Sequence, residues 1–175
     1  MTQRRTDEAP PAGPADSYLE SLRERLAADG CLVTAGTWND CRVVIGSRSD
    51  RRARWFGTKV ELFVLAAAVP AVDEVTLAAF TAWAMNYAKS IRSGVSGARN
   101  AAMVLPALIS TDVRPSARTW AAKDARLLGV TVIGRPITVE TSASKVTRVT
   151  MYQGKPLYGG LFTRHVLDKA SLYFR

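Results

Sequence analysis

The stretch RRARWFGTKVELFVLAAAV, Arg51–Val69, decides the fold, because it joins an arginine-rich segment to a nearly uninterrupted apolar run. Arg51–Arg54 has the composition of a solvated turn, whereas Val60–Val69 is typical of a core strand. The apolar run, even extended to Val72, is far shorter than the roughly 20 residues that a membrane-spanning helix requires. The stretch therefore predicts a basic turn followed by a buried strand of a sheet.

Helices and strands are expected to alternate on both sides of this stretch. Ser17 and Glu20 have the S-x-x-E spacing of a capping box, so a first helix is expected from Ser17 to Gly30. Apolar residues at helical spacing predict a second helix that begins at Asp73. The remaining predicted elements are strands over 31–40, 41–49, 53–67 and 102–110, a helix over 115–129, strands over 130–140 and 145–155, and a helix over 161–174.

The predicted order is α-β-β-β-α-β-α-β-β-α, which favours an α/β fold in which helices flank a mixed β-sheet. A chain of 175 residues is long enough for about one domain. Residues 1–16 are rich in proline, alanine and charge and predict a disordered tail, so residues 17–175 form the single α/β domain. No apolar segment of a secretory signal follows Arg4 and Arg5, and we expect a cytoplasmic protein with no membrane contact.

The charge of the chain favours an anionic partner. The net charge is +9, residues 1–16 contribute −1, and the rest of the chain therefore carries +10. Most of the basic residues are arginines, which make bidentate contacts with phosphate. We expect a non-catalytic module that binds nucleic acid or another polyanion, with Trp55 either stacked on bases or packed in the core. The candidate contact residues are Arg51, Arg52, Arg54, Trp55, Arg92 and Arg99.

Few residues of this chain point to cofactor chemistry. Cys31 and Cys41 lie in predicted strands on either side of a turn, where they could face each other, but reduced, small core residues are favoured over a disulfide. His165 is the only histidine, and a structural role for it is favoured over that of a general base. The sequence has no phosphate-binding loop, dinucleotide fingerprint or nucleophile elbow. No metal ion or cofactor is therefore expected.

The order of elements over residues 17–140 resembles the restriction-endonuclease-like, or PD-(D/E)XK, fold. In that superfamily an acid near the second core strand and an acid-x-Lys pair on the third bind a divalent metal that activates water. The resemblance implies that Asp40, Glu61 and Lys59 take these positions. The pair here has the reverse order, Lys59-x-Glu61, so an inactive relative is expected rather than a nuclease.

Two alternatives to polyanion binding remain open. The first is a metal-dependent nuclease with a degenerate active site made of Asp40, Glu61 and Lys59. The second is a protein-interaction module, chaperone-like or self-assembling into a homo-oligomer. It is suggested by Leu62–Ser90, which resembles domains related to type III secretion chaperones in its succession of strand, proline turn and helix.

Overall fold

Four α-helices and an eight-stranded mixed sheet make up the described part of the chain in the computed structural model, residues 12–51, 55, 58–91, 100–129, 131–144, 147–156 and 160–175. This confirms the predicted α/β class, with two more strands than expected. In chain order the elements are α1 (Pro14–Ala28), β1 (Leu32–Trp38), β2 (Cys41–Arg51), β3 (Lys59–Ala68), α2 (Glu74–Ile91), β4 (Asn100–Ser110), α3 (Pro115–Lys123), β5 (Arg126–Leu128), β6 (Val132–Gly134), β7 (Ile137–Thr141), β8 (Thr147–Met151) and α4 (Thr163–Tyr173).

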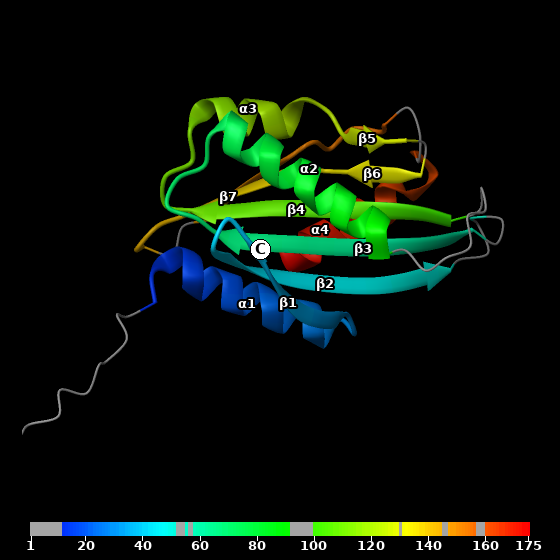
Figure 1. The fold of residues 1–175 in the computed structure, drawn as a ribbon, viewed down its shortest axis with the longest axis horizontal. Helices are drawn as coiled ribbons and strands as arrows, with labels where there is room; N and C mark the ends of the chain where they lie inside the picture. Colours follow the sequence, from blue (N-terminus) through cyan, green and yellow to red (C-terminus); the bar gives the residue numbers. More distant parts are fainter. Residues whose placement is uncertain are drawn as a thin grey trace, which may run out of the picture.

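The sheet is mixed because its two halves are connected differently. β1, β2 and β3 form an antiparallel meander, in which consecutive strands are neighbours. β4 lies parallel to β3, since the chain first passes through α2, which crosses in front of both strands in Figure 1. Beyond β4 the neighbouring strand is divided: β6 pairs with the first half of β4 and β7 with the second.

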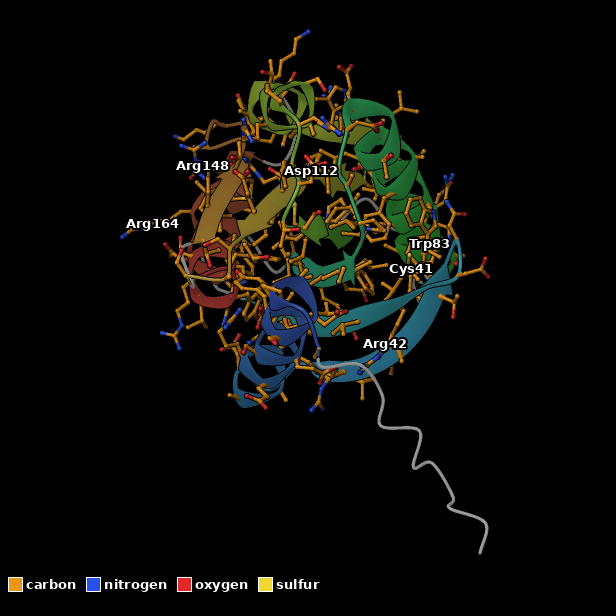
Figure 2. All side chains as sticks on the ribbon, turned by 90° about the vertical axis from the view of Figure 1, so that its left-hand side faces the viewer. Cys41, Arg42, Trp83, Asp112, Arg148 and Arg164 are labelled. Carbon is orange, nitrogen blue, oxygen red and sulfur yellow. The ribbon has the colours of Figure 1, made fainter. Side chains whose placement is uncertain are left out.

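The central strands are buried on both faces of the sheet, so the side chains of alternate residues pack into two separate hydrophobic cores. Leu62 and Val64 of β3 pack with α1 and α4, whereas Phe63 and Leu65 pack with α2 and α3. Figure 2 shows the resulting three layers, with α4 and α2 on opposite sides of the sheet. The helix residues that complete these cores include Leu19, Leu22, Leu26, Val166 and Ala170 on one face and Leu77, Phe80, Ala84, Ala117 and Ala121 on the other.

The break between β6 and β7 lies opposite a proline of the central strand. Val104 of β4 accepts a hydrogen bond from the backbone N–H of Arg135 at 2.8 Å. Backbone groups of alternate residues point to the same edge of a strand, so the nitrogen of Pro106, which has no hydrogen, faces this same neighbour. The chain between β6 and β7 stops pairing with β4 at Arg135–Pro136, opposite Pro106, which has no backbone N–H to donate. The strand predicted over 130–140 is therefore two strands.

Arg135 occupies this break and is 2% exposed. Its guanidinium donates to the carbonyl oxygens of Tyr152, at 2.7 Å, and Gly154, at 2.8 Å. Burial lowers the pKa of Arg135. The side chain links the break in the sheet to the segment that follows β8.

The predicted start of the first helix is wrong. α1 begins at Pro14 rather than Ser17, because proline suits the first position of a helix, and Gly13 is the N-cap residue. The N–H of Ser17 donates to the carbonyl of Gly13 at 2.9 Å, so Ser17 lies inside the helix and forms no capping box. The helical start also precedes the predicted domain boundary, while residues 1–11 of the predicted tail lie outside the described part of the chain.

The third helix and third strand are both shorter than predicted. α3 ends at Lys123, because Asp124 adopts an extended conformation, and Arg126–Leu128 form β5 against β6. β3 begins at Lys59 rather than at residue 53, and β2 runs two residues further than expected.

Candidate functional site

One end of the sheet gathers the residues that flank the arginine-rich segments. Arg51, the last residue of β2, pairs with Lys59, the first residue of β3, and Lys59 pairs in turn with Asn100, the first residue of β4. Ile91, the last residue of α2, lines a small cavity with Ser49 and Glu61 at the same end. We call this region the Arg51 end of the sheet; it lies on the right-hand side of Figure 1.

Of the arginines predicted to contact an anion, the structure describes only Arg51. Arg51 is exposed at the Arg51 end. Arg52, Arg54, Arg92 and Arg99 lie outside the described residues. The described residues that adjoin these segments in the sequence include Arg51, Lys59 and Asn100, which lie side by side at the Arg51 end.

Lys59 and Glu61 share a face of β3, as their spacing predicts. Lys59 Nζ donates to Glu61 Oε1 at 2.8 Å, and both side chains are largely shielded from solvent. Glu61 lines a cavity of about 260 Å³, and Ser49 of β2 lies opposite Glu61 in the register. The residue of β2 that lies opposite Glu61 is therefore a serine. A metal site at this position would need a second carboxylate there.

Asp40 does not join this pair. It is exposed in the turn between β1 and β2, next to Cys41, whereas the residue opposite Glu61 is Ser49. The nine-residue separation along β2 corresponds to about 30 Å. Asp40 and Glu61 therefore cannot ligate one metal ion, and within the described ranges no group of three His, Cys, Asp or Glu residues is arranged to hold one.

Trp55 lies inside the protein rather than on its surface. It is 0% exposed. Its ring meets those of Phe162 and His165 edge to face, with centroids 5.4 and 5.0 Å apart. An indole held in this way offers no free face to a nucleobase, so the structure fits core packing and not base stacking.

A polar cluster that was not predicted from the sequence joins α1, β2 and α4. Arg48 is its centre and donates to the carboxylate of Asp29 at 2.5 Å and to both carboxylate oxygens of Asp50 at 2.8 and 2.9 Å. Asp50 also meets Nε2 of His165 at 2.9 Å. From α4, Lys169 and Tyr173 donate to Asp29. The cluster comprises Asp29, Arg48, Asp50, His165, Lys169 and Tyr173.

Both carboxylates of the polar cluster are held in their charged form. Burial acts to raise the pKa of Asp50, but hydrogen bonds from Arg48 and His165 outweigh it, and the pKa is lowered. Burial also acts to raise the pKa of Asp29, but contacts with Lys169, Tyr173 and Arg48 outweigh it, and this pKa is lowered as well. The cations of the cluster therefore compensate its two partly buried acids.

The arrangement supports a structural role for the polar cluster. His165 is 2% exposed, so its pairing with Asp50 has no open path to a substrate. His165, Lys169 and Tyr173 follow at intervals of four, which places them on one face of α4. Two sequence signals could have revealed the cluster. One is that spacing, and the other is an aspartate at the C-terminal end of α1, where the helix dipole disfavours negative charge.

The two cysteines are free, as expected, and do not face each other. Cys41 lies opposite Trp38 at the turn between β1 and β2. Cys31 lies at the other end of β1, where its Sγ is 3.5 Å from Tyr173 Oη. Burial raises the pKa of the Cys31 thiol.

Exposed cations also occur away from the Arg51 end. Figure 2 shows Arg148 of β8 and Arg164 of α4 pointing outward on the side of the molecule opposite Trp83 and Cys41. Both arginines are exposed. They provide matched positions for testing whether an effect of charge depends on its location.

Comparison with protein-family models, with curated proteins and with solved structures found no match to this chain. Among the described residues, no helix is both long enough and apolar enough to cross a membrane.

Proposed function

We propose that this protein binds nucleic acid, or another polyanion of similar charge density, at the Arg51 end of the sheet. The observation that carries the proposal is the register of β2, β3 and β4. It sets Arg51, Lys59 and Asn100 side by side, so that the flanks of both arginine-bearing segments meet at one edge. A partner bound there would meet charges from two separate parts of the sequence.

The distribution of charge supports this location. Lys59 is paired with Glu61, and Arg48 is enclosed between Asp29 and Asp50, so neither is a first choice for an external anion. Arg51 is exposed, and no acid occurs in residues 51–60 or 91–101 of the sequence. The acids that flank residues 51–60 are already paired, Asp50 with Arg48 and Glu61 with Lys59. The exposed positive charge therefore attracts phosphate and releases counterions on binding.

The geometry supports a metal-dependent nuclease less well. That activity needs two carboxylates at bonding distance from one metal ion. Glu61 is engaged with Lys59, and Asp40 lies at the far end of β2. The predicted trio of Asp40, Glu61 and Lys59 therefore remains dispersed.

The proposal is tested by fluorescence anisotropy with labelled duplex DNA, single-stranded DNA and RNA near 50 mM salt. We expect binding to at least one of them, weakening steeply as salt is raised, because counterion release dominates contacts with phosphate. Affinity that is undetectable for all three at low salt would remove the proposal. Native purification supplies a second readout: a stoichiometric protein partner, or a homo-oligomer free of nucleic acid, would favour the protein-interaction alternative instead.

A further inference from the structure

A second candidate binding site lies at the opposite end of the sheet. A cavity of about 630 Å³ separates the first turns of α1 from the region between β7 and β8. Thr141, in its wall, follows Glu140, which pairs with Ser110 at the far end of β4 from Asn100. The volume is in the usual range for sites that bind small molecules. Among the residues that line it are Ser17, Tyr18, Arg25, Thr141, Ser142 and Arg175.

Three polar atoms on these walls are buried and make no hydrogen bond of good geometry in the described part of the protein, although the Arg25 guanidinium lies against the Tyr18 ring, 5.0 Å from its centroid. They are Tyr18 Oη, Arg25 Nη2 and Thr141 Oγ1. Tyr18 is 9% exposed and Thr141 is 5% exposed, so neither side chain is simply solvated. Buried polar atoms in native proteins are almost always satisfied, by the protein, by water or by a ligand. Their gathering around one cavity points to an occupant that accepts hydrogen bonds.

The charge of the cavity identifies the kind of occupant. Arg25 and Arg175 contribute two guanidinium groups, and no described residue that lines the cavity has a carboxylate side chain. Burial is the main influence on Arg25 and, with the nearby charge of Arg175, lowers its pKa, while Tyr18 and Glu24 act in the opposite direction. Burial raises the pKa of Tyr18, so its phenol remains a donor. A doubly charged oxyanion would balance the two cations.

We propose that this cavity binds a small phosphate monoester whose organic part bears hydroxyl groups. Arg25 and Arg175 match the charge of the phosphate, which is close to −2 near neutral pH. Tyr18 and Thr141 supply donors, while Ser17, Ser21, Ser142 and Thr147 add hydroxyls suited to a polyol. The inference is independent of the proposed function at the Arg51 end.

The test is a titration followed by ¹H–¹⁵N NMR, with ribose 5-phosphate, inorganic phosphate, ribose and acetate as probes. We expect saturable shifts of the amides of Ser17, Tyr18 and Ser142 with the two phosphates, stronger for the ester, and none with ribose. Arg25→Gln should weaken binding about tenfold or more, the usual effect of losing a charged hydrogen bond. The matched control is Arg23→Gln, an exposed α1 residue paired with Glu20, which should leave binding unchanged.

Arg25 also donates to the carbonyl of Tyr173 at 2.6 Å, so Thr141→Val serves as a second variant that spares this contact. Thr141→Val should weaken ribose 5-phosphate binding several-fold while the protein stays folded. The proposal is overturned if neither phosphate gives saturable shifts at these amides, or if both variants bind like the unmodified protein. An equal response to acetate and phosphate would overturn the assignment to a phosphate ester.

Discussion

At the scale of single residues, Asp50 shows how buried charge holds this molecule together. Its carboxylate accepts two hydrogen bonds from Arg48 and contacts His165, which belongs to the last helix. The 115-residue separation between Asp50 and His165 explains why sequence patterns do not reveal the contact. Local spacing places His165, Lys169 and Tyr173 on one helix face but does not show that Asp50 lies against His165.

Replacing Asp50 with asparagine should lower the free energy of unfolding by about 1–3 kcal/mol near neutral pH, because Arg48 and His165 lose a charged acceptor. The folded-state pKa of Asp50 is lowered, so its contribution is present above the unfolded-state pKa and is lost as pH falls through the folded value. Urea denaturation should therefore show that the difference in unfolding free energy between the unmodified protein and Asp50→Asn becomes smaller below about pH 4. A difference that stays constant down to about pH 3 would contradict this account. Asp112→Asn, at an exposed pair with Arg114, is the control.

Trp55 provides a second test at this scale. Because it is buried, Trp55→Phe should leave affinity for single-stranded nucleic acid nearly unchanged while reducing stability through the smaller ring. A stacked aromatic contributes about 1–3 kcal/mol per base. A loss of affinity of about fivefold or more, measured by anisotropy on the folded variant, would therefore show that Trp55 does contact the nucleic acid.

At the scale of elements, periodicity predicts the long helices and strands but not the short strands. α2 and β3 have apolar patterns long enough to be recognised in isolation. β5 and β6 have three residues each and exist because each pairs with a neighbour. The division of the strand predicted over 130–140 coincides with Pro136 inside that segment and with Pro106 of β4, so the segment carries part of the signal and the neighbouring strand carries the rest.

Arg135 should be the residue on which this divided region depends most. Arg135→Met removes two hydrogen bonds to backbone carbonyls and should cost about 2–4 kcal/mol, measured by urea denaturation. Hydrogen exchange should also speed up within residues 152–156, which accept the Arg135 hydrogen bonds. The control is Arg148→Met, at an exposed position of β8, where a change within about 0.5 kcal/mol is expected. Equal stability of the two variants would show that Arg135 does not anchor the segment.

At the scale of the whole molecule, the fold follows from the sequence more directly than the site does. The α/β class and nearly the whole order of elements are predictable, because they depend on local periodicity and turns. The site depends on which ends of strands coincide, and the register of β2, β3 and β4 supplies that information. The same register separates Asp40 from Glu61, which spacing alone cannot decide.

The most direct test of polyanion binding compares two triple variants that remove the same charge from different places. One changes Arg51, Arg52 and Arg54 to glutamine, and the other changes the exposed Arg114, Arg148 and Arg164. Binding to duplex DNA is measured across a series of salt concentrations. If the Arg51 end is the interface, the first variant should reduce the magnitude of the salt slope by about 2.7, while the second leaves it nearly unchanged. Equal effects of the two variants, or a slope that neither alters, would contradict the account.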